Sequence, residues 1–563
     1  MKKHIVTGLT VVLAVWLIAT RHAFFRIDLT EEGRYSLSDA SCRQLERIEE
    51  PMTLNIYLAG DLDANMLRLR HEILDLVDEM NVVADNKIEV CEIDPSDAPS
   101  DEKRYANYQA LEARGMRGMS VTNRERNGKI SEGVVFPWAE LCSEHDTMQI
   151  CLLQPGSRTS GEESVNVAVE DIEFEIIDAV RVLTDCNPKR IAFIDGHGEL
   201  DEAHTFDIMN ALSRYFYVDR GILGSDPEVL NDYAAIVIAK PVKPFSESDK
   251  YIIDQYVMRG GSVLWLIDGV QMSDSMLSLN GMTPLIANDV NLNDMLFRYG
   301  VRITPTVLED MQCGYMPVNM SRVGETPRFE PIPWTFSPLL QLSPLHPVTK
   351  TLNDIKADYA AGIEIVGDTF DMVKEVLMVT SNASHVNWAP SEIDVMQAIK
   401  VEPEQYFVNS FIPVGVAMEG VFTSVFTHRT VPDGINQSRP TVERSPRTRM
   451  VVVADGDMAR NEIQRQQDGS MSFLPVGYDR VTRQQHGNRD FIVNAMLYLT
   501  DSDGVMQLRR KQVGMHLLNR VSAEQNRSLC AVVNIALPII LLLVVGFIYN
   551  VLRKRKYAGA VSK

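Results

Sequence analysis

The chain has 563 residues, more than one hydrophobic core organises, so at least two domains are expected. Its composition is that of a folded protein, with 45% hydrophobic and 23% charged residues. The formal net charge of −21 argues against a nucleic-acid-binding protein, which would present a basic face, and no nucleic-acid partner is expected.

The first apolar run predicts a transmembrane helix at residues 4–25. Its first part, HIVTGLTVVLAVWLIAT at residues 4–20, carries no charged side chain. Because a bilayer core needs roughly 20 apolar residues, the helix must extend to Phe25, past Arg21, whose long side chain reaches toward the interface. A cleaved signal peptide is the alternative, but Arg21 falls within the candidate cleavage motifs.

A second uncharged run predicts another transmembrane helix at residues 528–552, and a basic tail follows at residues 553–563. Since Lys and Arg clusters favour the cytoplasmic side, both termini are predicted to be cytoplasmic and residues 26–527 to be extracytoplasmic. Basic residues at positions 509–527, just before the second span, argue against this orientation.

Between the spans, the pattern predicts a juxtamembrane segment at residues 26–50 and a small α/β domain at residues 51–155. Ser38 is expected to cap a helix that begins near Asp39. The domain is predicted to contain strands at 53–59, 88–93, 120–123, 129–135 and 147–153, and helices at 64–85 and 102–114. This β-α-β-α-β-β order suggests a thioredoxin-like domain. The CxxC motif of a thioredoxin is absent, so a scaffold or binding module without redox activity is expected.

The seven cysteines show neither redox nor zinc-binding spacing. Cys142 and Cys151 could face each other across a predicted hairpin, where an oxidising compartment would allow a disulfide. Separate buried cysteines are the alternative that we favour. No metal ion and no cofactor is expected.

A second α/β domain is predicted at residues 165–500. Its predicted strands lie at 190–194, 234–239, 262–267, 375–380 and 449–454, and its helices at 169–184, 206–215, 247–259 and 490–499. Apolar strands that alternate with amphipathic helices imply a buried parallel sheet. Residues 310–350, rich in Pro, Met and Gly, predict an irregular insertion, and residues 501–527 predict a juxtamembrane helix.

Three of these strands end in Asp-Gly, in the segments IAFIDG (191–196), VLWLIDG (263–269) and VVVADGD (451–457). In an open parallel sheet, ligands bind beyond the carboxyl ends of the strands. If the three strands share one sheet, they form an acidic surface for a ligand or a partner. This candidate strand-end rim comprises Asp195, Gly196, His197, Gly198, Glu199, Asp268, Asp455 and Asp457.

The turn GHGE at 196–199 could be catalytic, metal-binding or structural. Metal binding by His197 and carboxylates is chemically possible, but side chains two residues apart beyond a strand end do not converge on one point. The interpretation that we favour is structural. Gly196 and Gly198 permit a tight turn, in which His197 and Glu199 bind the backbone or cap the next helix.

Catalysis by a nucleophile is not expected. A hydrolase would need a Ser or Cys at a strand-to-helix elbow, but no G-x-S-x-G or G-x-C-x-G motif occurs. Cys313 precedes Gly314 within the predicted insertion, with Met311 where the elbow glycine should be. The chain also lacks GxxxxGK[ST], so it is not itself an ATPase of this type.

Several motifs resemble the GldG family of gliding-motility-associated ABC-transporter auxiliary components, over nearly the whole length. DLTEEGRYSLS at 28–38 is similar to the family's motif after its first span, and GHGE at 196–199 to a turn of the family. VVVADGDMARNE at 451–462 resembles its late strand and loop, and residues 534–558 resemble its final span.

This resemblance implies a non-enzymatic, membrane-anchored subunit of the bacterial inner (cytoplasmic) membrane, with its bulk in the periplasm. Its partners would be an ABC permease subunit and a separate cytoplasmic ATPase, with the transported ligand left open. The second domain would resemble class I glutamine amidotransferases, which have a flavodoxin-like sheet, without their nucleophile. Two alternatives stay open: an extracytoplasmic hydrolase or amidotransferase-like enzyme using the acidic rim, and a solute-binding protein.

Overall fold

The computed structural model describes residues 37–510, with gaps, and scattered residues between 532 and 550. The gaps are at 125–129, 154–160, 186, 320, 322–325, 327, 353, 368–371, 399–402, 438 and 467–468. The predicted segments that lie wholly or partly outside the described residues are the spans at 4–25 and 528–552, the juxtamembrane segments at 26–50 and 501–527, and the tail at 553–563. Among the described residues, no helix is both long enough and apolar enough to cross a membrane.

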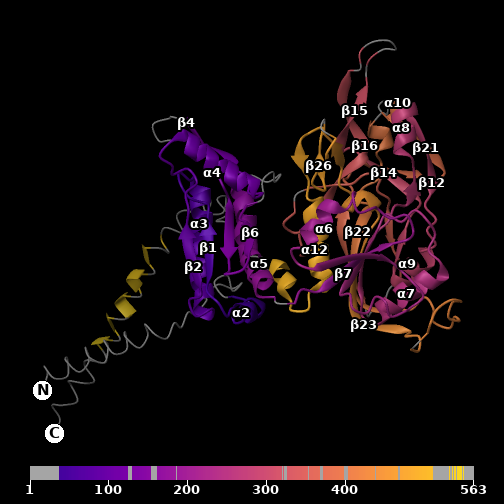
Figure 1. Ribbon diagram of the computed structural model, residues 1–563. Helices are drawn as coiled ribbons and strands as arrows, with labels where there is room; N and C mark the ends of the chain where they lie inside the picture. Colours follow the sequence, from indigo (N-terminus) through magenta and orange to yellow (C-terminus); the bar gives the residue numbers. More distant parts are fainter. Residues whose placement is uncertain are drawn as a thin grey trace, which may run out of the picture. The chain divides into compact units, whose positions relative to one another are not determined.

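The first α/β region contains a mixed sheet of four strands, in the order β2-β1-β5-β6 (Figure 1). The strands are β1 (Met52–Ile56), β2 (Ile88–Glu92), β5 (Trp138–Cys142) and β6 (Thr147–Cys151). β1 and β2 are parallel, whereas β5 runs antiparallel to both β1 and β6. β3 (Met119–Arg124) and β4 (Ile130–Val135) form a separate hairpin.

Four helices accompany this sheet: α2 (Asp39–Leu45), α3 (Ala64–Val83), α4 (Asp101–Ala113) and α5 (Gly161–Thr184). The Ser38 hydroxyl accepts a hydrogen bond from the Ser41 backbone N–H, which confirms the predicted cap of α2. The face of α3 that carries Ile73 and Val77 is fully buried, and α5 packs against it.

The structure excludes the disulfide considered between Cys142 and Cys151. Cys142 pairs with Thr147, and Cys151 pairs with Trp138, so the cysteines lie at opposite ends of the β5–β6 hairpin. Four residues of strand separate these pairs by about 13 Å. A disulfide requires Cα atoms within about 7 Å. Both cysteines are accordingly free thiols.

The second α/β region is built on a large mixed sheet, in the order β15-β16-β19-β22-β23-β10-β9-β7-β8. The strands on the β8 side of the sheet, through β23, run parallel: β7 (Arg190–Asp195), β8 (Tyr217–Ile222), β9 (Ala235–Ala239), β10 (Ser262–Leu266) and β23 (Arg444–Val453). The others are antiparallel: β15 (Cys313–Asn319), β16 (Phe329–Leu342), β19 (Met372–Val379) and β22 (Pro413–Thr423). The predicted parallel sheet is therefore confirmed for its central part.

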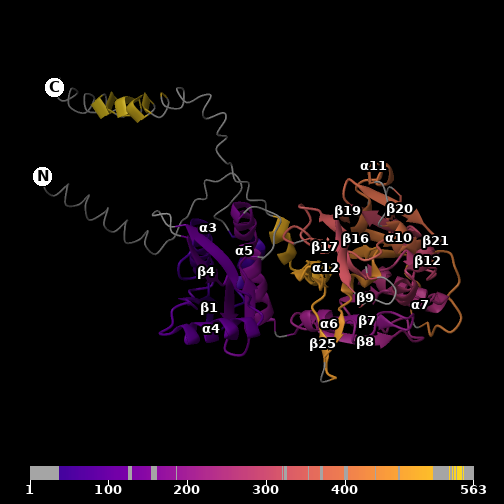
Figure 2. The ribbon, with the colours of Figure 1, turned by 90° about the horizontal axis from the view of Figure 1, so that it is seen from above.

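Helices cover both faces of the parallel strands (Figure 1 and Figure 2). Alternate side chains of these strands enter two different cores. Phe193, for example, faces α6 (Phe206–Leu212) and α12 (Asn488–Thr500). The neighbouring Ile194 belongs to the core of α7 (Glu247–Met258) and α9 (Asn293–Tyr299). Burial on both faces explains why the central strands β7, β9 and β10 are largely apolar.

The prediction of an irregular insertion at 310–350 is wrong, because most of this segment forms the β15–β16 hairpin. Pro317 lies opposite Pro331 in the register. Neither proline has an N–H to donate, so such a pair is compatible with an antiparallel ladder only where the facing residues exchange no backbone hydrogen bond. The prolines that suggested loop structure are thus accommodated within strands.

Shorter elements complete the second region. The helical ones are α8 (Asp274–Asn280), α10 (Val395–Ala398), α11 (Pro403–Tyr406), η1 (Gly456–Ala459) and η2 (Val505–Arg510). The short strands are β11 (Val270–Gln271), β12 (Met282–Ala287), β13 (Val301–Ile303), β14 (Thr306–Asp310), β17 (Ile355–Lys356), β18 (Ile363–Ile365), β20 (Ser384–Trp388), β21 (Ser391–Asp394), β24 (Ile463–Arg465), β25 (Met471–Phe473), β26 (Tyr478–Asp479) and β27 (Gln484–Gln485).

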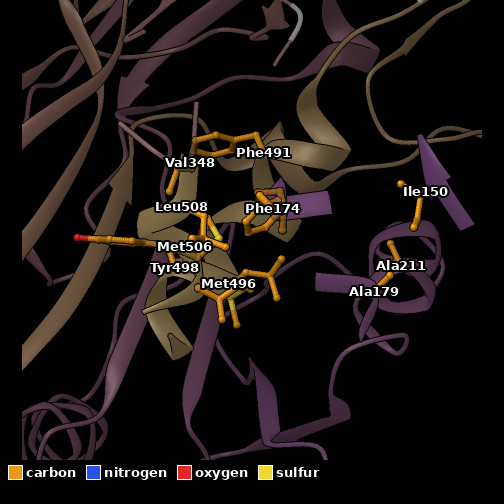
Figure 3. Close-up of a cluster of buried hydrophobic side chains, with 14 of the residues drawn as sticks. Ile150, Phe174, Ala179, Ala211, Val348, Phe491, Met496, Tyr498, Met506 and Leu508 are labelled. Carbon is orange, nitrogen blue, oxygen red and sulfur yellow. The ribbon is translucent and has the colours of Figure 1, made fainter. Parts of the chain in front are cut away.

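The segment that follows α12 packs against α5. η2 follows α12 and packs on α5, where Phe174 shares one apolar cluster with Met506 and Leu508 (Figure 3). The Arg509 guanidinium lies over the Phe174 ring, 3.9 Å from its centroid, and pairs with Glu175 at 2.7 Å. This ion pair and the apolar cluster join η2 to α5 of the first α/β region.

Candidate functional site

The carboxyl ends of β7, β9, β10 and β23 lie along the same edge of the sheet, because the four strands are parallel. β7 lies between β8 and β9 in the sheet, and the strand order reverses at this point. The loops that follow β7 and β9 leave the sheet there. Ligands of open α/β sheets bind at such a point. The predicted rim residues lie at or just after the ends of β7, β10 and β23, along this edge.

Asp195, at the end of β7, is paired within the sheet. Both its carboxylate oxygens accept hydrogen bonds from Arg220 of β8, at 2.7 and 2.8 Å. Arg220 also donates to the Thr205 hydroxyl at 2.8 Å. Its guanidinium is thus fully engaged by neighbouring acceptors, and Asp195 carries no uncompensated charge toward a ligand.

The GHGE turn has the backbone that its glycines predict. Gly196 and Gly198 adopt φ values of 124° and 77°, in the region that favours glycine. Glu199 accepts a hydrogen bond from the His197 backbone N–H at 2.7 Å. The His197 carbonyl in turn accepts from the N–H groups of Val242 and Lys243, at 2.9 and 2.8 Å. Backbone hydrogen bonds therefore tie the turn after β7 to the loop after β9.

The His197 ring is held from three sides. Its Nδ1 lies 3.1 Å from Glu199, its Nε2 lies 3.2 Å from Asp249 near the start of α7, and its face stacks on Phe245 with ring centroids 3.6 Å apart. Burial alone would lower the pKa of His197, but hydrogen bonds to Glu199 and Asp249 outweigh it, and the pKa is raised. Both ring nitrogens are occupied by carboxylates, so neither is free for a substrate proton.

The structure brings together three of the predicted carboxylates, those of Asp268, Asp455 and Asp457. One oxygen of each lies within 4.8 Å of the others. Lys240, the residue after β9, places its ammonium 3.4 Å from Asp268 and also donates a hydrogen bond to Asp457. Such oxygens could hold a divalent cation. Here the lysine already supplies the positive charge.

Burial dominates the electrostatics of this cluster. It raises the pKa of Asp268 to about 6, although the Lys240 ammonium acts in the opposite direction. The pKa of Asp455 is raised well above its usual range by burial and then by the neighbouring carboxylates of Asp457 and Asp268. Asp455 accepts backbone hydrogen bonds from Asp457 and Asp358, which satisfies both its oxygens. The carboxylates organise loops around Lys240.

The rim is therefore not one acidic crevice. Among the described residues, no direct ion pair or hydrogen bond joins the His197 group to the Asp268 group. The carboxylates of the first group contact the His197 ring, and those of the second pair with Lys240 and Arg460. Sequence reasoning missed the partners, namely Arg220, Lys240 and Asp249. Lys240 follows a fully buried apolar strand, and this position was the one available signal for a paired lysine.

Cys313 does not occupy a nucleophile elbow. It begins the strand β15, opposite Pro338 of β16. Burial, followed by the nearby Asp310 carboxylate, raises the pKa of its thiol to about 11. The reactive form of a cysteine is the thiolate, so this environment suppresses nucleophilic reactivity.

Comparison with known proteins places the larger region in context. Residues 188–495, more than half of the chain, match the family model described as an ABC-type uncharacterized transport system. Residues 31–141 match the model of a domain of unknown function. No curated protein matches the chain. Among solved structures, "mmIFT52 N-terminal domain" is similar at 10% sequence identity and a TM-score of 0.32, over 56% of this chain and 99% of that chain.

Proposed function

The chain belongs to the family of ABC-type uncharacterized transport systems, as an auxiliary transport component, and from this premise we propose that it is a non-enzymatic, extracytoplasmic subunit of an ABC transporter complex. The family match over residues 188–495 carries the proposal. Members of such systems work with a permease and an ATPase, and these are the proposed partners. The transported ligand is not assigned.

The state of the strand-end rim supports a role without catalysis. At the place where α/β enzymes keep reactive groups, Asp195 is paired with Arg220, and Lys240 is paired with Asp268 and Asp457. His197 has a carboxylate at each ring nitrogen. These contacts favour a rigid turn structure over an acid, base or nucleophile.

Membrane anchoring and a link to gliding motility are finer parts of the same proposal. The motifs at 28–38 and 534–558 resemble the GldG family, whose members are auxiliary components of a motility-associated transporter. The described residues between 532 and 550 are helical, and large apolar side chains such as Leu542 and Phe547 are more than two-thirds exposed. Exposed apolar helix surface of this kind supports insertion in a bilayer. We place both termini in the cytoplasm and residues 26–527 in the periplasm.

The strand orders support the finer fold assignments that we propose. In the first region, the order β2-β1-β5-β6, with one parallel and two antiparallel pairs, fits a thioredoxin-like domain without CxxC. In the second region, the parallel strands follow the order β8-β7-β9-β10-β23, which numbered along the chain is the flavodoxin-like 2-1-3-4-5 arrangement. The amidotransferase-like domain that we propose has this sheet.

Co-purification tests the proposal directly. A tag on the full chain, expressed in its own host and extracted with mild detergent, should recover a permease and an ATPase that an untagged strain does not yield. Recovery of the chain without either subunit would contradict the transporter assignment. A reporter active only in the cytoplasm should work after Lys563 and fail at Gly161; the opposite pattern would contradict the topology.

The enzyme alternative has a separate test. An activity-based probe for serine and cysteine hydrolases should leave the purified chain unlabelled. Covalent labelling that disappears in Cys313→Ala or His197→Ala would favour the hydrolase or amidotransferase-like alternative. A solute-binding protein would instead be recovered without a permease or an ATPase in the co-purification.

A further inference from the structure

A pocket away from the strand-end rim collects positive charge in an acidic protein. It has a volume of about 390 Å³, and the residues that line it include Arg117, Arg480 and Arg483, with Gln464 and Tyr478. No carboxylate is among the described residues that line it, although the chain carries a net charge of −21. We call this feature the arginine pocket.

Most of the polar groups of the arginine pocket have no partner within the described protein. The side chains of Arg117 and Arg483 form no ion pair or hydrogen bond with any described residue, and the same holds for Gln464 and Tyr478. Arg480 is the exception, because it pairs with Glu462 and donates to the Ile463 carbonyl at 3.3 Å. Two guanidiniums, an amide and a phenol are therefore available to a ligand.

The loop that carries two of the arginines is fixed in place. It connects β26 and β27, and the buried Asp479 accepts hydrogen bonds from the backbone N–H groups of Val481 and Thr482, at 2.7 and 3.3 Å. Arg483 adopts a φ of 58°, a left-handed conformation that is strained for a residue with a side chain. A held, strained loop presents its side chains at a reduced entropic cost of binding.

The chemistry of the arginine pocket selects an oxyanion. Planar guanidinium groups bind phosphate or carboxylate oxygens through two parallel hydrogen bonds, and several together favour the more highly charged phosphate. Leu474 and Pro475 add an apolar wall beside these donors. The volume lies at the lower end of small-molecule sites, which span roughly 300–1,000 Å³.

We infer that the arginine pocket binds the phosphoryl group of a small phosphorylated molecule, either free or as a lipid headgroup. Arg117 and Arg483 hold the phosphoryl oxygens, Arg480 borders the site while paired with Glu462, and Leu474 and Pro475 contact the uncharged part. This ligand site goes beyond the transporter role proposed above and does not depend on it.

Calorimetric titration of the full chain in neutral detergent tests the site, with inorganic pyrophosphate as the probe for a free ligand. Saturable binding is expected, weakened about tenfold or more in Arg117→Gln and in Arg483→Asn, since each variant removes charged hydrogen bonds to the phosphoryl oxygens. Asn is chosen because it tolerates the left-handed backbone. Arg465→Gln, an exposed arginine of β24 outside the pocket, is the matched control and should bind like the wild type.

Short-chain phosphatidic acid, with the matching phosphatidylcholine as control, distinguishes the two sources of the phosphoryl group. Tighter binding of the phosphatidic acid than of pyrophosphate, sensitive to Arg483→Asn, would identify a lipid headgroup. The reverse order would identify a free ligand. No saturable binding of either probe would overturn the inference, and so would an equal loss in the Arg465→Gln control.

Discussion

The strand-end rim and the arginine pocket both gather charged side chains, but they satisfy these charges in opposite ways. At the rim, Lys240 and Arg220 neutralise carboxylates inside the protein, and His197 bridges two more. In the arginine pocket, Arg117 and Arg483 have no partner among the described residues. A position at the carboxyl ends of parallel strands therefore does not by itself make a binding site.

This difference has a physical basis. A buried charge is costly unless a counter-charge or hydrogen bonds compensate it, so partners that the fold supplies indicate a structural role. An arginine without a partner on an acidic protein gives up attraction to the protein's own carboxylates. An anionic ligand that binds the arginine restores an attraction of this kind. Variants at the rim should accordingly change stability, whereas variants in the arginine pocket should change binding.

The largest effect is expected for Lys240→Met. Loss of the ammonium leaves the buried Asp268 without its cation, whereas Asp457 keeps its ion pair with Arg460. Breaking a buried ion pair costs about 3 kcal/mol or more. The apparent melting temperature should fall well below that of the wild type, and less so near pH 6, where protonation of Asp268 removes part of the charge. The control is Lys243→Met, which changes an exposed side chain three residues further along the chain. This variant should melt like the wild type. Equal melting temperatures of Lys240→Met and Lys243→Met would contradict the structural interpretation of this cluster.

A smaller effect is expected for Gly198→Val. The backbone φ of 77° is unfavourable for a β-branched residue, and its Cβ would lie 2.6 Å from a methyl of Val242. Strain of this kind costs about 1–3 kcal/mol, so the melting temperature should drop by several degrees. Gly224→Val has open space around the Cβ and no positive φ, and it should have little effect. If Gly198→Val melted like Gly224→Val, the GHGE turn would not be a rigid part of the fold.

The third effect is a pH dependence carried by His197. Because its pKa is raised in the folded state, protonated His197 contributes stability that is fully present below the ordinary value of 6.5. The contribution is lost as the pH rises through the folded pKa. His197→Gln should therefore destabilise the protein by about 1–2 kcal/mol below that value, through lost charged hydrogen bonds, and by less at alkaline pH. Melting curves of the wild type and of His197→Gln, recorded from below pH 6.5 to alkaline pH, measure the difference in stability. The other histidines contribute equally to both proteins, so their contributions cancel in this difference. A difference that grew with pH would contradict the assignment.

The sequence predicted the elements whose signal is local. Apolar strands between amphipathic helices indicated the parallel sheet, the glycines of GHGE indicated the turn, and Ser38 indicated a helix start. β8 was missed because it is the edge strand, and its half-exposed sequence YVDRGI has no apolar run. The β15–β16 hairpin was missed because proline usually ends a strand, except at pairs that exchange no backbone hydrogen bond.

The partners of the charged rim residues could not be predicted from local sequence, because each pair joins residues far apart in the chain. Arg220 lies 25 positions from Asp195, Asp249 lies 52 from His197, and Asp457 lies 217 from Lys240. Only the order of strands in the sheet brings them together. The sequence therefore located the charged strand ends but not their partners, and an acidic crevice was predicted where compensated clusters exist.

The smallest stability effect is expected in the arginine pocket itself. Arg117→Gln removes a side chain that makes no ion pair or hydrogen bond with the described residues, and surface substitutions of this kind change stability by less than about 0.5 kcal/mol. Its melting temperature should match that of Arg465→Gln without ligand. Saturating pyrophosphate should then raise the melting temperature of Arg465→Gln but not that of Arg117→Gln, since a ligand stabilises only the protein that binds it. A large fall in stability without ligand would mean that Arg117 is paired after all, and the contrast with the rim would no longer hold.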